Sequence, residues 1–188
     1  MIDLSIRIIH RLDIPEPKII DVGSAIGTTL HALYEAGYRH LYGVDSSAEM
    51  LARSFDKATL IESEQFPVEH GPFDVVIANW VLHFIHDRQD YLQTIKDSLS
   101  EKGVLILTEK IAGSELANEL YHDFKRANGM TEQQIEEKKQ RLEGVLVTYP
   151  LQWYFEQLAS LGFQHIEVIN ANTVFVTLLA SQRQMIPA

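Results

Sequence analysis

Two carboxylates and a loop of small residues lie close together in the first quarter of the chain. Asp21 stands two residues before Gly23, in the segment 18–27 that reads KIIDVGSAIG. Asp45 ends a second apolar run, LYGVD, roughly twenty residues past the loop, where a carboxylate meets ribose hydroxyls in nucleoside-binding α/β proteins. Carboxylates accept hydrogen bonds from hydroxyls and pair with cations, whereas they repel phosphate in a half-buried site. These residues predict a site for a positively charged, phosphate-free nucleoside.

The composition of the loop separates two classes of ligand. A dinucleotide-binding loop would read G-x-G-x-x-G, with its middle glycine letting a pyrophosphate approach the helix N-terminus. In this chain Ala25 holds the middle position and Thr28 replaces the third glycine. Small residues let a ligand lie against the backbone. We therefore expect Gly23, Ser24, Ala25 and Gly27 to contact the ligand.

Polar residues also follow the next predicted strands. Glu64 and Gln65 come after a short strand, and Asn79 ends the longer apolar run FDVVIANW. Because parallel strands end at the same edge of a sheet, we expect these side chains to face one crevice, with Glu64 placed to accept from the amine of an adenine. Ser46 extends the predicted ligand site and, with Glu49, predicts a capping box for the following helix.

Composition restricts the remaining functional classes. The 188 residues carry a formal net charge of −10 and no cysteine. Direct nucleic-acid binding is not expected of such an acidic chain, and thiol chemistry is excluded. His83 and His86 lack a third metal ligand, so we expect packed or hydrogen-bonded histidines and no metal. The first residues resemble neither a signal peptide nor a membrane span, which predicts a cytoplasmic protein without a membrane partner.

The alternation of apolar strands with helices predicts one doubly wound α/β domain over 1–188, with a helical insertion at about 113–145 after the fifth strand. The insertion is a candidate lid, substrate wall or homodimer contact, although charged helices also occur as plain solvated faces. The predicted helices that position the rest are 4–12, 28–36, 47–55, 89–99 and 150–161. The predicted strands include 40–44, 104–108, 165–169 and 173–179.

The loop D-V-G-S-A-I-G resembles the first motif of the class I S-adenosylmethionine-dependent methyltransferases, an acidic residue followed by G-x-G-x-G, with a departure at Ala25. The resemblance implies a mostly parallel seven-stranded sheet whose C-terminal strand inserts antiparallel. It also implies S-adenosylmethionine, or its product S-adenosylhomocysteine, as the ligand.

The segment 121–148, YHDFKRANGMTEQQIEEKKQRLEGVLVT, resembles the matching part of bacterial carboxy-S-adenosylmethionine synthases, as does the pair Glu109 and Lys110. The resemblance implies that prephenate loses carbon dioxide, which is captured by the S-methyl carbon of the cofactor, giving carboxy-S-adenosylmethionine and phenylpyruvate. That family supplies the cofactor for wobble-uridine modification of tRNA.

In that family an arginine of the inserted helix holds the new carboxylate, and the aligned residue here is Lys139, the implied catalytic residue. Lysine keeps the charge but loses the bidentate geometry of a guanidinium. Arg126 and Arg141 are alternative cations nearby in sequence. Two other functions stay open: a conventional methyltransferase acting on a small molecule, and a protein that binds the cofactor without catalysis.

Overall fold

The computed structural model describes residues 1–183, and the last five residues of the predicted single domain lie outside it. The strands are β1 (Ile19–Val22), β2 (Leu41–Asp45), β3 (Thr59–Glu62), β4 (Phe73–Asn79), β5 (Leu99–Lys110), β6 (His165–Asn172) and β7 (Phe175–Ser181). The helices are α1 (Ile2–Ile9), α2 (Thr28–Glu35), α3 (Ala48–Leu51), α4 (Arg88–Asp97), α5 (Glu115–Ala127), α6 (Glu132–Leu142) and α7 (Leu151–Ser160), with short 3₁₀ turns η1 (Val68–His70) and η2 (Leu82–Phe84).

The strands form one seven-stranded sheet in the order β3-β2-β1-β4-β5-β7-β6. The first five strands pair in parallel, and β7 lies antiparallel between β5 and β6. The order reverses between β1 and β4, so the carboxyl ends of these strands flank the crevice where open α/β sheets bind ligands. The predicted doubly wound sheet with an antiparallel C-terminal strand is confirmed.

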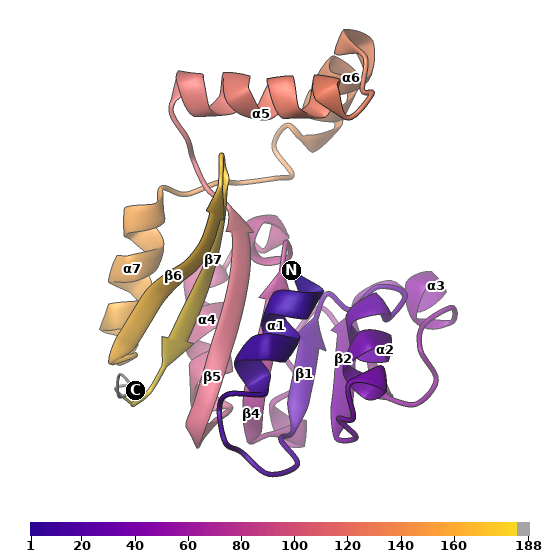
Figure 1. Ribbon diagram of the computed structural model, residues 1–188, viewed down its shortest axis with the longest axis vertical. Coiled ribbons are helices and arrows are strands. Elements are labelled where there is room, and N and C mark those ends of the chain that lie inside the picture. Colours follow the sequence, from indigo (N-terminus) through magenta and orange to yellow (C-terminus); the bar gives the residue numbers. More distant parts are fainter. Residues whose placement is uncertain (184–188) are drawn as a thin grey trace.

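Helices cover both faces of the sheet (Figure 1). On one face α1 and α2 bury Ile9, Leu30 and Leu33 against the strands. On the other face α4 and α7 bury Leu92 and Leu158. The inner strands β1, β2, β4, β5 and β7 are mostly buried, which explains their nearly continuous apolar sequences, whereas the edge strands β3 and β6 are partly or fully exposed.

Two predicted elements differ most from the structure in their boundaries. β5 begins at Leu99 and not at residue 104, because Leu99 already pairs with Phe73 before a register shift in the ladder. The helix predicted at 47–55 is the single turn α3, capped by Ser47, whose hydroxyl accepts from the N–H of Met50 at 3.3 Å. The predicted capping box of Ser46 with Glu49 is therefore wrong.

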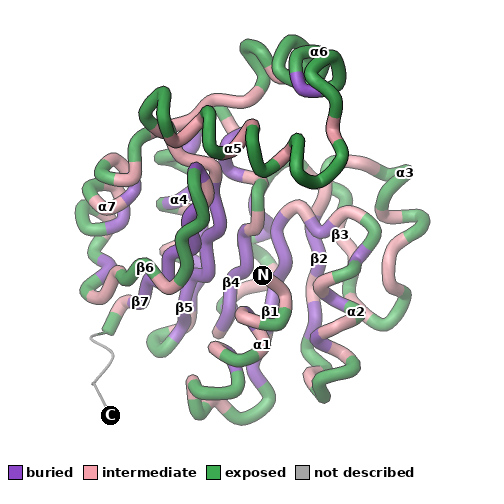
Figure 2. Tube along the Cα trace, turned by 45° about the horizontal axis from the view of Figure 1, so that its top comes forward, coloured by how far each residue is buried: buried purple, intermediate pink, exposed green. Residues whose placement is uncertain are grey.

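The insertion forms α5 and α6, which lie above the carboxyl edge of the sheet (Figure 1). Thr131 and Gln134 make the predicted reciprocal capping box at the start of α6. Most of both helices is exposed (Figure 2), and Ile135 is their one residue buried below the surface in the described chain. Among residues 1–183, no helix is long and apolar enough to cross a membrane.

Candidate functional site

The loop after β1 is built on left-handed backbone conformations. Gly23, Ala25 and Gly27 have φ angles of 68°, 47° and 74°. A Cβ added at Gly27 would lie 2.7 Å from the backbone nitrogen of Phe55, so this position accepts no side chain without displacement of its neighbour. Glycine is required here for both its conformation and its size.

Asp45 joins this loop to the end of β2. Its Oδ2 accepts a hydrogen bond from the N–H of Ala25 at 2.9 Å, and its Oδ1 accepts from the N–H of Ser47 at 2.9 Å. A carboxylate has about four lone-pair sites, so each oxygen keeps capacity for a further donor. The two backbone bonds fix the orientation of the carboxylate.

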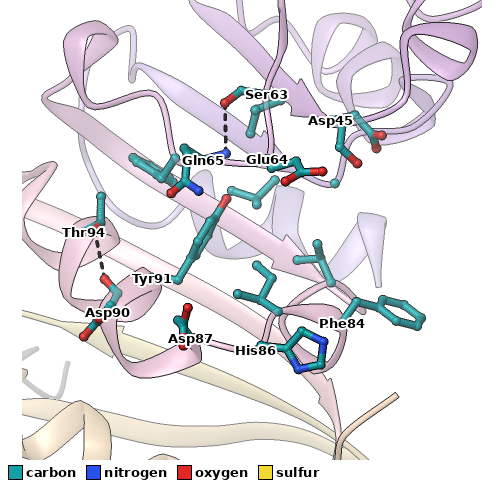
Figure 3. A pocket seen from close by; sticks show the side chains of 17 residues that line it. Asp45, Ser63, Glu64, Gln65, Phe84, His86, Asp87, Asp90, Tyr91 and Thr94 are labelled. Atoms are coloured by element: carbon teal, nitrogen blue, oxygen red, sulfur yellow. Dashed lines mark hydrogen bonds between the residues drawn. The ribbon is translucent and has the colours of Figure 1, made fainter. Parts of the chain in front are cut away.

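A cavity of about 740 Å³ opens beside Asp45. Residues from the ends of β2 and β3 lie on one side of it, and residues from the chain after β4 lie on the other (Figure 3). Five of the predicted ligand residues line it: Gly23, Asp45, Ser46, Glu64 and Gln65.

The charge of the cavity is one-sided. Its walls include the carboxylates Asp45, Glu64, Asp87 and Asp90. No lysine or arginine from the described part of the chain lines it. Such a wall attracts a cation and repels polyphosphate, although only Asp45 of the two carboxylates noted in the sequence belongs to it.

Asp21 lies behind the loop and outside the cavity lining, with 3% of its surface exposed. The pKa of its carboxyl group is raised to about 7, mainly by burial; a hydrogen bond with the Thr29 side chain lowers it, and the charge of Asp45 adds a smaller increase. Asp21 can therefore exist in either protonation state near neutral pH.

Ser24, Ala25, Gly27 and Asn79 also lie outside the lining, although they belong to the elements that surround it. Within residues 1–183, the hydroxyl of Ser24 and the Oδ1 atom of Asn79 are buried without a hydrogen-bond partner. Buried polar atoms are normally paired. These two residues therefore keep hydrogen-bonding capacity on the elements that surround the cavity.

The opposite wall of the cavity was not predicted. It comprises Val81, Phe84, Ile85, His86, Asp87, Asp90, Tyr91 and Thr94. Its sequence signal is weak, because these residues belong to a 3₁₀ turn and one face of an ordinary amphipathic helix. Asp87 and Asp90 contribute two of the four carboxylates that line the cavity.

The two histidines lie in different surroundings. His83 is buried, with Nδ1 3.0 Å from Oε2 of Glu109, and His86 lines the cavity. The predicted packed and hydrogen-bonded role is confirmed for His83. In residues 1–183 no cluster of three or more His, Cys, Asp or Glu side chains could hold a metal ion.

The structure places Lys139 on the outside of α6. Its side chain is 70% exposed, lies 3.9 Å from a carboxylate oxygen of Glu136 and is absent from the cavity lining. Arg126, one alternative cation, forms ion pairs with Asp123 and Glu132.

A different group of cations gathers where the insertion meets β5. Lys110 ends β5, and its ammonium lies 5.6 Å from the ring centre of Tyr121, which also holds the ammonium of Lys125 at 4.4 Å. Burial and then the charge of Lys138 lower the pKa of Lys110, and burial followed by the charges of Lys110 and Lys138 lowers the pKa of Lys125. The ion pairs of lysine within residues 1–183 lie elsewhere. We call Lys110, Lys125 and Lys138 the lysine cluster.

Several known proteins are similar to this chain in sequence. A methyltransferase domain family model matches residues 2–174. The carboxy-S-adenosyl-L-methionine synthase of Nautilia profundicola is 30% identical, over 95% of this chain and 83% of the relative. That of Methylococcus capsulatus is 36% identical, over 88% of this chain and 77% of the relative.

Solved structures agree on the fold. Magnesium protoporphyrin IX methyltransferase from Synechocystis with bound S-adenosylhomocysteine superposes with a TM-score of 0.67 at 16% identity, over 97% of this chain and 82% of that one. An S-adenosylmethionine-dependent methyltransferase from Corynebacterium glutamicum gives 0.63 at 14% identity, over 95% and 87%. Together with the sequence relatives, these matches show that the chain belongs to the methyltransferase domain family and is an S-adenosylmethionine-dependent transferase of class I fold.

Proposed function

We propose that this protein is a cytoplasmic carboxy-S-adenosylmethionine synthase that uses prephenate as its small-molecule substrate. Its product would serve wobble-uridine modification of tRNA without direct contact between this chain and the nucleic acid. The observation that carries the proposal is the division of charge: the cavity is acidic, whereas the lysine cluster is free of carboxylate partners within residues 1–183.

The acidic cavity is the proposed cofactor site. We assign Asp45 to the ribose hydroxyls, Glu64 and Gln65 to the adenine, and the loop of Gly23 to Gly27 to close backbone contact with the ligand. The Oδ1 atom of Asn79 and the hydroxyl of Ser24, which lack partners among residues 1–183, would form hydrogen bonds with polar groups of the ligand. Bound S-adenosylmethionine supplies the S-methyl carbon that receives the carboxyl group.

The lysine cluster is the proposed site for the carboxylates of prephenate. Lys110 follows Thr108 by two residues, and the carbonyl of Thr108 accepts from the N–H of Trp80, directly after Asn79. The cluster therefore lies at the ends of β4 and β5, at the edge of the sheet that carries the cavity. Like charges held together raise the free energy of the protein, and an anion removes that cost. Lys139 would serve as a further cation if the insertion closes on the ligand.

A direct test is mass spectrometry of the cofactor after incubation with S-adenosylmethionine and prephenate. We expect a cofactor product heavier by one carbon dioxide, together with phenylpyruvate, and neither product when prephenate is omitted. Failure to form the heavier product at high enzyme concentration, with cofactor binding intact, would refute the proposed reaction. Methylation of another small molecule would then support the conventional methyltransferase.

We further propose that the protein forms a homodimer through α5. Leu116, Leu120 and Phe124 follow one another at a spacing of four residues and are 64%, 50% and 52% exposed. An apolar stripe on one face of a helix is typical of a helix that packs on a partner, and a second copy offers the same stripe. We expect Leu120→Asp to convert a dimer into a monomer in sedimentation experiments, whereas Val68→Asp, at another exposed apolar residue, should not. A monomeric wild type would contradict this assignment.

A further inference from the structure

A buried arginine connects the wall of the cavity to the chain that returns from the insertion. Arg88 is the first residue of α4, and only 2% of its surface is exposed. Its Nε donates to the carbonyl of Leu82 at 2.7 Å, and its Nη2 donates to the carbonyl of Val147 at 2.8 Å. One rigid guanidinium thus holds two backbone segments that are 65 residues apart in sequence, counting from position 82 to position 147.

The first of these segments carries the cavity wall. Residues on both sides of Leu82 and Arg88 line the cavity, including Val81, Phe84 and Asp87. Leu82 and Arg88 themselves are buried and lie outside the lining. The guanidinium therefore supports the wall from behind.

The second segment is the end of the insertion. The N–H of Val147 donates to the carbonyl of His83 at 2.9 Å, next to the bond from Arg88. The guanidinium also lies over the ring of Tyr149, 4.7 Å from its centre, and Tyr149 stacks on Trp153 at 4.3 Å. Cation–π contact and hydrogen bonding together restrain residues 147–149 against the wall.

A second set of hydrogen bonds connects Arg88 to Glu109 through Tyr154. The Nη1 of Arg88 donates to the hydroxyl of Tyr154 at 2.8 Å, and that hydroxyl donates to Oε2 of Glu109 at 3.2 Å. Burial, followed by the charge of Glu109, raises the pKa of Tyr154, so its hydroxyl stays protonated and keeps this donor role. This branch links the charges of Arg88 and Glu109 but does not touch residues 147–149.

We infer that Arg88 is a positioning residue that couples the cofactor cavity to the helical insertion. A ligand that orders the wall at residues 81–91 also orders the returning segment at residues 144–149, and through it α5 and α6. Lysine cannot replace Arg88, because one ammonium lacks the planar set of donors that reaches both carbonyls. The ligand-dependent part of this inference rests on cofactor binding in the cavity.

Hydrogen–deuterium exchange with mass spectrometry tests the coupling in three variants. Without ligand, we expect Arg88→Met and Arg88→Lys to accelerate exchange in peptides covering 144–149 by about fivefold or more, as expected for the loss of one charge-assisted hydrogen bond. Exchange in β4 should stay unchanged. Tyr154→Phe removes the other branch and is the matched control, because both carbonyl contacts of Arg88 remain. Arg39→Met, at the opposite end of the sheet, controls for the loss of an arginine.

Addition of S-adenosylhomocysteine gives the second measurement. We expect slower exchange at 81–91 in all proteins, and slower exchange at 144–149 in wild type, Tyr154→Phe and Arg39→Met only. The inference would be overturned if S-adenosylhomocysteine protected residues 144–149 in Arg88→Lys as strongly as in wild type. It would also be overturned if Tyr154→Phe lost this protection as fully as Arg88→Lys does, because that result would indicate general destabilisation. If wild type bound no S-adenosylhomocysteine, cofactor binding would be refuted, and the measurement without ligand would still decide the role of Arg88.

Discussion

The carboxylate of Asp45 accepts a hydrogen bond from the backbone N–H of Ala25 at 2.9 Å. This bond connects the end of β2 to the glycine loop after β1, although the two residues are twenty positions apart in sequence. It fixes the orientation of the carboxylate before any ligand arrives, so little ordering is left to occur on binding.

We predict that Asp45→Ala weakens binding of S-adenosylhomocysteine by about 1–3 kcal/mol, because ribose hydrogen bonds and the support of the loop are both lost. Asp45→Asn keeps the size of the side chain, so its affinity for S-adenosylhomocysteine should lie between those of wild type and Asp45→Ala. Calorimetry measures the difference, with Asp56→Ala on the exposed surface as control. An unchanged dissociation constant in Asp45→Ala would remove this residue from the ligand site.

Gly27 and Gly129 provide a matched pair for the stability of the loop. Both have positive φ angles, 74° and 87°, but only Gly27 is crowded by neighbouring atoms. We predict that Gly129→Ala costs about 1 kcal/mol through backbone conformation alone. Gly27→Ala should cost about 1–3 kcal/mol more, because the added methyl group meets Phe55. Urea unfolding measures both, and equal losses would show that the loop can relax.

Asp21 predicts a pH dependence of stability. Its pKa is raised by burial from 3.8 to about 7 in the folded protein. Between these values the folded state binds the proton more tightly than the unfolded state does, so the free energy of unfolding falls as pH rises from about 4 to about 7. The decrease reaches on the order of 4 kcal/mol.

Asp21→Asn removes this ionisation. The variant should therefore be stabilised relative to wild type, and by more at pH 8 than at pH 5. Thermal unfolding at the two pH values measures the difference. A stability gain that is independent of pH would assign the ionisation to another group.

If the lysine cluster binds prephenate, removal of one of its lysines should affect the use of prephenate but not the binding of the cofactor. Removing one cation from a carboxylate site should cost about tenfold or more in prephenate-dependent turnover. Lys138→Ala should therefore lower kcat/KM for prephenate while leaving the dissociation constant of S-adenosylhomocysteine within about twofold. Lys57→Ala, in an exposed ion pair with Asp56, is the control. Lys139→Ala tests the aligned lysine, and equal losses for carboxylated and plain cofactor would exclude it from the carboxylate site.

Local sequence signals predicted the parts of the molecule that depend on neighbouring residues. The loop at Gly23 to Gly27 and the capping box at Thr131 with Gln134 each need only a few consecutive residues. The helix predicted after Asp45 is shorter in the structure. Its N-cap is Ser47 and not Ser46, and the N–H of Ser47 donates a hydrogen bond to the carboxylate of Asp45.

Contacts between distant segments could not be predicted in this way. Arg88 opens an ordinary amphipathic helix, and nothing in its local sequence indicates that it is buried against Val147 and Tyr154. The lysine cluster likewise depends on how α5 and α6 fold back toward the end of β5. The resemblance to carboxy-S-adenosylmethionine synthases indicated Lys139, whereas the structure brings Lys110 and Lys125 together at Tyr121.

The two ends of the insertion meet at one backbone hydrogen bond, from the N–H of Ala112 to the carbonyl of Tyr149 at 2.9 Å. The stretch between these positions takes no part in the strand ladder, and Val147 within it is held to the domain by His83 and Arg88. The fold therefore allows the length of residues 113–146 to vary without a change in strand pairing, provided that the contacts of Val147 with His83 and Arg88 remain.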